Sequence, residues 1–456
     1  MTAVAEREPR TDPAVARLLA DYEAFAASTN GKMPAWVREL RDRGIQRFAK
    51  AGFPSTKEEW WRFTSVEPIA RARFVEAPTP TMPADLSDAL RDVEAAGGQG
   101  AHVAVFHNGR FAPGLSSLHG LPEGVVIGGL RDALESQPDL VRQNLGQVAD
   151  IESNPFTALN TAFFRDGAFV HVARNVVVEQ PIQLVFVSSS NGEPWVTHPR
   201  NLVVFDYGAQ ASLIEQYVGS GGSYWTNVVS ELVLGEDAVL DAYRIQQERE
   251  DAFHMAESYS RQDRSSVYTS VVFAFGSRLS RHDIRATLDG EGAECTLNGL
   301  SVLRGEQHVD HHTTLEHAKP HCPSWEVFNG IYDDRARGVF TGRIIVDPGA
   351  QRTDSKQTNN NLLLTEEARA DSQPQLEIYA DDVKCTHGAT LGPIDDKALF
   401  YLQSRGLDRE DARALLTYGF GAEVLNSVSV DSLRAYLDAL LQARLEEGSR
   451  KRAAVK

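Results

Sequence analysis

Hydrophobic residues recur at helical spacing near both ends of the chain. Apolar positions three and four residues apart predict amphipathic helices over residues 13–27 and 34–48. The same spacing returns after residue 398, in the segments KALFYLQSRGL, DREDARALLTYGF and VDSLRAYLDALLQARLEEG. The sequence therefore predicts a helical region at each end.

Two shorter signals lie between the first helices and the middle of the chain. In the segment STKEEWW, Ser55 and Glu58 have the spacing of a capping box, which predicts a new helix carrying Trp60 and Trp61. The proline-rich stretch over residues 76–88 is typical of a linker or a surface crossing. We expect the first helical region to end near this stretch.

From about residue 101 to residue 390 the period changes to that of β-strands. Short β-branched runs such as AHVAVF, IQLVFV, NLVVFD and GRIIV are separated by Gly, Asp and Asn turns. Long connections with a helical pattern are missing between these runs, which argues against a doubly wound parallel sheet. A sandwich, a barrel or a solenoid remains.

A weak internal repeat favours the solenoid. The pattern Gly-x-x-Ala ends at Ala211, Ala238 and Ala293, and Ala350 ends a similar turn, with steps of 27, 55 and 57 residues. A turn of small residues that recurs at one coil length is what a parallel β-helix needs, because bulky corners could not stack. The predicted organisation is a helical region over 1–100, a β-helix over 101–390 and a helical region over 391–456. The part up to about residue 155 is a candidate transition segment.

Composition and charge limit the classes of function. The chain has 456 residues, 42% hydrophobic and 24% charged, without the eighteen or more consecutive apolar residues of a membrane span. A net charge of −17 disfavours nucleic acid as a partner. The first residues lack an apolar signal segment, and three cysteines are too few for a disulfide framework. These features predict a cytoplasmic protein that binds neither membrane nor nucleic acid.

One stretch of fifteen residues concentrates potential metal ligands. It holds five of the thirteen histidines together with one cysteine: His308, His311, His312, His317, His321 and Cys322. Imidazole and thiolate are natural ligands of zinc or iron, and Asp310 and Glu316 could add carboxylates. The spacing lacks an HExxH helix or a CxxC pair, so we favour the alternative that these side chains lie at coil corners and make hydrogen bonds there.

A second candidate site is the segment Cys385-Thr386-His387. On a strand, Cys385 and His387 face the same way, so a thiol and an imidazole would lie side by side. This pair could ligate iron or exchange sulfur. The alternative is a buried structural cysteine beside a capping histidine. The sequence has no P-loop motif, so we expect no ATP hydrolysis by this chain.

Several long segments together are similar to one family. The runs NPFTALNTAFFRDGAFVHVARNVVVEQPIQLVFV, EGAECTLNGLSVLRGEQHVDHHTTLEHAKPHCPS, GVFTGRIIVDPGAQRTDSKQTNNNLLL and ADDVKCTHGATLGPIDDKALFYLQSRGL resemble the SufB/SufD family of iron–sulfur cluster assembly scaffolds. The resemblance spans about residues 150–425. Within the family, the form KCTHGATLG resembles the SufD branch.

The resemblance implies a mainly β fold, a right-handed parallel β-helix flanked by helical domains. It also implies a SUF-type complex with two partners: a SufB-like paralogue that pairs through the β-helix, and a SufC-like ATPase that docks on the C-terminal helices. A homodimer without SufB stays open. Periodicity and resemblance together suggest that the docking contacts include Leu407, Leu415, Leu416 and Phe420.

By resemblance, His387 matches a histidine implicated in cluster assembly at the SufB–SufD interface, and Cys385 lies beside it. Both are candidate ligands of a transient iron–sulfur cluster shared with SufB, whose other ligands would come from SufB. We expect no cluster or metal to be held stably by this chain alone.

The leading hypothesis is thus a non-catalytic scaffold subunit whose ATPase activity lies in a partner. One alternative is a metal-dependent β-solenoid or cupin-like enzyme that uses His308, His312 and His317 from the cluster over residues 308–321. Another is a β-helix polysaccharide lyase, which the missing secretion signal disfavours.

Overall fold

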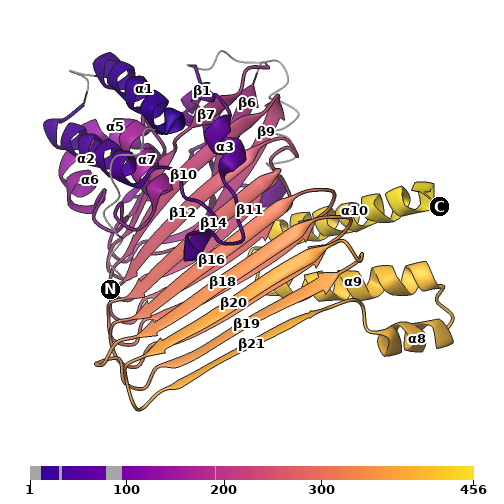
Figure 1. Ribbon diagram of the computed structural model, residues 1–456. Coiled ribbons are helices and arrows are strands. Elements are labelled where there is room, and N and C mark those ends of the chain that lie inside the picture. Colours follow the sequence, from indigo (N-terminus) through magenta and orange to yellow (C-terminus); the bar gives the residue numbers. More distant parts are fainter. Residues whose placement is uncertain (1–11, 30–32, 79–94, 191, 456) are drawn as a thin grey trace.

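The fold is known from a computed structural model, which describes residues 12–29, 33–78, 95–190 and 192–455, with side chains through residue 448. The linker predicted over residues 76–88 falls mainly outside these ranges. Two long β-sheets and the turns between their strands make up the body of the described chain (Figure 1).

The first sheet consists, in chain order, of β4 (Val125–Gly129), β5 (Ala168–Val172), β8 (Arg200–Phe205), β10 (Tyr224–Leu234), β12 (Phe253–Gln262), β14 (Leu279–Leu288), β16 (His308–His317), β18 (Arg337–Val346) and β20 (Arg369–Ile378), with β1 (Val75–Glu76) and β7 (Trp195–Thr197) joined beside β10. The second sheet consists of β2 (His102–His107), β3 (Arg110–Phe111), β6 (Val177–Ser190), β9 (Gln210–Gly221), β11 (Val239–Gln246), β13 (Val267–Ala274), β15 (Glu294–Leu303), β17 (Pro323–Tyr332), β19 (Asp354–Leu363) and β21 (Lys384–Gly392).

From β8 on, successive strands alternate between the two sheets, so each coil contributes one strand to each. From β10 to β21, every strand pairs in parallel with the strand two before it in the chain. Antiparallel pairing is confined to β2 with β3 and β4 with β5, at the start of the body. This topology confirms the predicted parallel β-helix.

One corner of the coil shows why small residues recur. Four fully buried small residues occupy equivalent places before the strands of the second sheet: Ala209, Ala238, Ser266 and Ala293. Each follows a residue in the left-handed backbone region, which favours Gly, Asp or Asn: Gly208, Asp237, Ser265 and Gly292. The amide of each left-handed residue donates to a carbonyl of the next coil. The predicted repeat is therefore real at Ala238 and Ala293, but its first member is Ala209, since Ala211 lies within β9, and its last is Thr353, which follows left-handed Arg352, and not Ala350.

N-terminal helices cover the outer face of the first sheet (Figure 1). They are α1 (Pro13–Thr29), α2 (Ala35–Ala51), α3 (Glu67–Arg71), α5 (Leu130–Ser136), α6 (Pro138–Asn144) and α7 (Pro155–Phe163), with short 3-10 turns η1 (Glu59–Trp61) and η2 (Pro113–Leu115). The pattern of hydrophobic residues predicted α1 and α2 but missed α7. Every residue of α7 from Phe156 to Phe163 is buried, and its polar residues Thr157, Asn160 and Thr161 make hydrogen bonds inside the protein, so no charged, solvent-facing stripe marks its period.

The helix predicted from the capping box is wrong. The backbone N–H of Ser55 does donate to Glu58 Oε1 at 3.1 Å. The chain then makes only the turn η1, because Trp61 packs inward against the buried ring of Phe156, at 5.4 Å between ring centroids. Burial of the tryptophan outweighs the local signal for a helix.

The C-terminal helices are α8 (Asp396–Ser404), α9 (Arg409–Leu425) and α10 (Asp431–Val455). Asp408 caps α9 by accepting from the amide of Asp411 at 2.8 Å. Leu433, Leu437 and Leu441 of α10 are fully buried in one cluster with residues of the second sheet. None of the described helices is both long and apolar enough to cross a bilayer.

Candidate functional site

The β-helix is uncovered at its C-terminal end. β20 and β21 are the last strands of the two sheets, and within the described ranges no strand pairs with their far edges. Their residues are exposed or half-buried throughout, whereas the strands two coils earlier are mostly buried. We call β20 and β21 the open end; it is the lower edge of the body in Figure 1.

Cys385 and His387 lie together on β21 at the open end. Cys385 is half-buried and packs against the core between the two sheets, so its side chain points inward. His387, two residues on, shares this face and is exposed, because no further coil covers it. The outer face is marked by Thr390, which donates to Asn360 Oδ1 at 2.7 Å. The predicted side-by-side geometry of thiol and imidazole thus fits the strand they occupy.

The environment keeps the thiol of Cys385 protonated. Burial raises its pKa, and the nearby carboxylate of Asp354 adds to this effect. A thiol becomes a metal ligand by losing its proton, and a bound cation favours that loss. In this structure Cys385 is therefore a neutral thiol, and a nearby cation would be needed to favour its thiolate form.

The strand beneath the pair is polar on its inner face. Four inward residues of β19 are between 1% and 6% exposed, and all carry hydroxyl or amide groups: Ser355, Gln357, Asn359 and Asn361. We call them the polar row. Ser355 is in register with Cys385, and Gln357 is in register with His387. The thiol and the imidazole therefore lie on a floor of buried hydrogen-bonding groups.

A buried acid supports the polar row from below. Gln357 Nε2 donates to Glu326 Oε2 at 2.6 Å, and Glu326 of β17 is fully buried. Burial raises the pKa of Glu326 to about 7, against the lowering effect of hydrogen bonds such as that from Gln357. Coil spacing offers the signal that could have found this residue: Glu326, Gln357 and His387 follow one another at one-coil steps.

The histidine-rich stretch is divided between two faces of β16. His308, Asp310 and His312 lie on the outer face, beneath the N-terminal region, as their alternation predicted. His308 Nε2 and Thr64 Oγ1 are 2.9 Å apart, and His312 Nε2 and Asp310 Oδ1 are 3.0 Å apart. Burial alone would raise the pKa of Asp310, but His312 and Arg281 hold it well below its usual value. This face also borders a cavity of about 380 Å³ under the adjacent tryptophans.

His311 and His317 point instead into the interior between the sheets. His311 Nε2 lies 3.2 Å from Ser301 Oγ, and His317 Nε2 lies 3.0 Å from Ser324 Oγ. Burial lowers the pKa of both rings to about 4, so they are neutral at pH 7. Since His317 faces away from His308 and His312 on the same strand, the three cannot share one metal, and the triad of the predicted metal enzyme is wrong.

Only the end of the histidine-rich stretch lies at a coil corner. His321 has a φ of 62° and its amide donates to the carbonyl of Gln351, as at the other left-handed corner positions. Cys322 follows it as the buried small residue of that corner. The expectation that all these side chains lie at corners is therefore wrong for the four histidines of β16. In the part of the chain that is described, no three His, Cys, Asp or Glu side chains are grouped to hold a metal ion.

The four residues expected to contact an ATPase differ in exposure. Leu407 and Leu416 are half-buried, Leu415 of α9 is 49% exposed, and Phe420 packs partly against the body. The sequence analysis missed Phe400 and Tyr401 of α8, which are 72% and 57% exposed. Both lie within the apolar pattern KALFYLQ, and that pattern does not reveal which apolar side chains stay uncovered.

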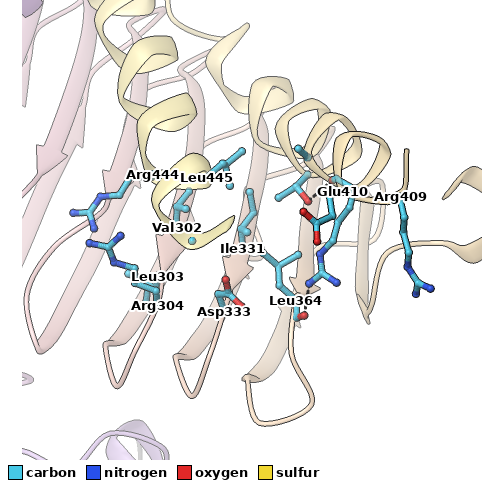
Figure 2. A pocket seen from close by; sticks show the side chains of 14 residues that line it. Val302, Leu303, Arg304, Ile331, Asp333, Leu364, Arg409, Glu410, Arg444 and Leu445 are labelled. Carbon is cyan, nitrogen blue, oxygen red and sulfur yellow. Dashed lines mark hydrogen bonds between the residues drawn. The ribbon is translucent and has the colours of Figure 1, made fainter. Parts of the chain in front are cut away.

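A cavity of about 240 Å³ separates α9 and α10 from the strand ends (Figure 2). Arg444 and Leu445 of α10 lie over Val302 and Arg304 in this view. Arg304 is paired with Glu447 of α10, which ties the last helix to the body.

Comparisons with known proteins agree with this architecture. Residues 186–420 match the family model "SUF system FeS cluster assembly, SufBD core domain", and residues 15–184 match "SufBD protein N-terminal region". An iron–sulfur cluster assembly SufBD family protein of Synechocystis is 33% identical over 86% of this chain and 87% of its own length. The iron–sulfur cluster assembly protein SufD of Escherichia coli is 30% identical over 89% and 92%, and that of Bacillus subtilis is 26% identical over 94% and 99%.

The raised pKa of Glu326 predicts a pH-dependent stability. The ordinary value is 4.5, so the folded chain binds this proton more tightly than the unfolded chain does. Its contribution to the free energy of unfolding is greatest below pH 4.5 and is lost as the pH rises through about 7, by on the order of 3 kcal/mol. We expect Glu326→Gln to remove this loss, so that the variant gains on wild type in urea unfolding between pH 5 and pH 8. Exposed Glu306→Gln is the control, and equal pH profiles for wild type and Glu326→Gln would contradict the assignment.

Proposed function

The chain belongs to the SufBD family of iron–sulfur cluster assembly proteins, and we propose that it serves there as a scaffold subunit of the SufD type. The observation that carries this proposal is the pair Cys385 and His387 at the open end, where a thiol and an imidazole are within reach of a second chain. In this proposal the subunit builds clusters with a SufB-like paralogue and docks a SufC-like ATPase.

The unpaired edges of β20 and β21 support pairing with the paralogue. A sheet edge presents backbone N–H and C=O groups that a further strand can bind, and natural proteins cover such edges. Ile378 and Leu391, on the two strands of the open end, are 40% and 57% exposed. A paralogue with the same fold would bring matching edges and bury these side chains. Without the paralogue, a second copy of this chain could take its place.

The chemistry of the pair suits an iron–sulfur cluster as cargo. Thiolate and imidazole both ligate iron in such clusters. Two ligands are fewer than a cluster needs, so the remaining ligands would come from the paralogue across the interface. The cluster would then be shared and transient, with none held stably by this chain alone.

The ATPase would dock on the C-terminal helices. Phe400, Tyr401 and Leu415 are large apolar side chains exposed on α8 and α9, which lie side by side in Figure 1. Exposed aromatic residues are typical anchors of protein interfaces. Because the sequence contains no P-loop, ATP hydrolysis would belong to the partner and this subunit would be non-catalytic. We place the complex in the cytoplasm.

We expect His387→Ala to lower the iron and acid-labile sulfide bound per assembled complex by about tenfold or more, since loss of a metal-orienting group commonly costs 10–100-fold. The complex itself should still assemble, because an exposed side chain contributes little to folding. Iron and sulfide analysis of the purified three-protein complex, with complementation of a strain that lacks the native subunit, provides the measurement.

Two variants sharpen this test. Cys385→Ser shows whether the thiol is a ligand, with an effect equal to that of His387→Ala, or a supporting group with a milder one. His119→Ala removes an equally exposed histidine far along the chain and should change nothing. Normal cluster content in His387→Ala would mean that this ring only caps the end of the β-helix.

For the ATPase, we expect Phe400→Ser combined with Leu415→Ser to weaken binding of a SufC-type ATPase by about 30-fold, the effect of losing an interface anchor worth roughly 2 kcal/mol. Substitution is preferable to truncation, because α10 is part of the buried core. Trp325→Ser removes a residue that is 42% exposed on the β body and serves as the matched control. Affinity is measured by calorimetry; unchanged binding in the double variant would refute this docking surface.

A further inference from the structure

We propose that Gln357 and Glu326 are positioning residues for His387: a buried hydrogen-bonded column that holds the imidazole ring in one orientation and one tautomer. This inference rests on the proposed function of His387, but its geometry belongs to this chain alone. The three residues occupy equivalent places on the adjacent strands β17, β19 and β21.

Strand register brings the three side chains into one line. Glu326 pairs with Gln357, and Gln357 pairs with His387, all on the inner face. Neighbouring strands lie about 4.8 Å apart, so side chains in register are neighbours along the ladder. Gln357 is 1% exposed and Glu326 is fully buried. The column therefore begins in the core and ends at the exposed imidazole.

The amide of Gln357 has one free end. Its nitrogen donates to Glu326 Oε2 at 2.6 Å, which fixes the direction of the amide. Its oxygen, Oε1, is buried without a hydrogen-bond partner. An unpaired buried carbonyl oxygen costs about 1–3 kcal/mol, so it is retained where a donor is available. His387 is in register with Gln357 one strand along and is not hydrogen-bonded to it in this structure; rotation of the ring would bring one of its N–H groups to this oxygen.

The opposite wall leaves the amide little freedom. A Cβ atom added at Gly342 of β18 would lie 2.2 Å from Gln357 Nε2 and 2.8 Å from Oε1. Only glycine gives the amide room to extend across the interior. Gln357 is thus confined between Glu326 and Gly342, which is the rigidity that a positioning residue needs.

The column differs from the earlier coils in a way that packing alone does not require. One coil before Glu326, the equivalent residue is Leu297, which is buried and apolar. In the first coils this column holds Ile182, Leu213 and Ala242. It passes through Ser270 and Leu297 and becomes charged or amide-bearing only at Glu326 and Gln357, the last two places before His387. Burying an acid and an amide there is costly without a purpose at the end of the column.

The test uses the full-length chain without partners and observes the ring of His387 directly. In protein labelled with ¹⁵N-histidine, assigned with His387→Ala, we expect the ring nitrogens of His387 to show one dominant tautomer. Those of exposed His119 should show the free mixture. Gln357→Leu, which keeps the size and removes both polar groups, should return His387 to that mixture.

A double variant distinguishes a specific effect of Gln357→Leu on His387 from a general loss of folding. Glu326→Gln combined with Gln357→Glu exchanges acid and amide, which preserves a hydrogen bond between them and an acceptor toward position 387. We expect the exchanged column to keep the single tautomer. Asn361→Leu is the matched control, because Asn361 is another buried amide on β19, 6% exposed, in register with Leu391 and not with His387. It should leave His387 unchanged. A free mixture in wild type, or a single tautomer in Gln357→Leu, would overturn the inference.

In the assembled complex, Gln357→Leu should lower cluster iron by about tenfold, and the double variant should restore most of it. The two proposals can fail separately. If the tautomer depends on Gln357 while His387→Ala assembles clusters normally, the column is correct and the role of His387 is wrong. If clusters require His387 but its tautomer is the same in wild type and Gln357→Leu, the proposed role of His387 in cluster assembly is supported. The column then only caps the end of the β-helix.

Discussion

Each coil of the β-helix supplies the backbone hydrogen-bonding partners of the next coil, and this constraint shapes the whole molecule. Side chains in register must stack, so corners require small buried residues and left-handed positions such as Asp237 and Ser265. The stack must also stop, and the last strands are left with unpaired edges. An uncovered sheet edge is a place where another chain can join. The constraint that builds the body therefore also creates the site.

Stacking also places polar side chains of successive coils next to one another. A side chain of one coil lies next to the residues in register with it on the two preceding coils. His387 follows Gln357 and Glu326 in this way, and Cys385 follows Ser355 and Ser324. Ser355 Oγ and Ser324 Oγ are themselves 2.7 Å apart. Two parallel columns of polar groups thus reach the open end, one below the thiol and one below the imidazole. In the first coils the same places are filled by apolar side chains, which supply the core that holds these columns in register.

Much of this arrangement follows from sequence, where the pattern is local. The alternation of β16, the coil length and the inward pairing of Cys385 with His387 could be predicted because each depends on spacing along one strand or one coil. The helix α7 was missed, since it is only nine residues long, contains no charged residue and is buried on nearly every side. The density of histidines over residues 308–321 suggested a shared metal site that does not form, because adjacent strand residues point to opposite faces. Glu326 and Gln357 were missed because their partnership spans three coils and appears only once register is known.

The central claim is that a partner with the same fold closes the open end over Cys385 and His387. Backbone hydrogen exchange tests it most directly, since amides at an uncovered edge exchange readily and pairing protects them. The account predicts that adding the SufB-like paralogue slows exchange in β20 and β21 far more than in the outer strands β2 and β3 at the start of the body. Protection confined to the start of the body, with β20 and β21 unchanged in the assembled complex, would contradict it.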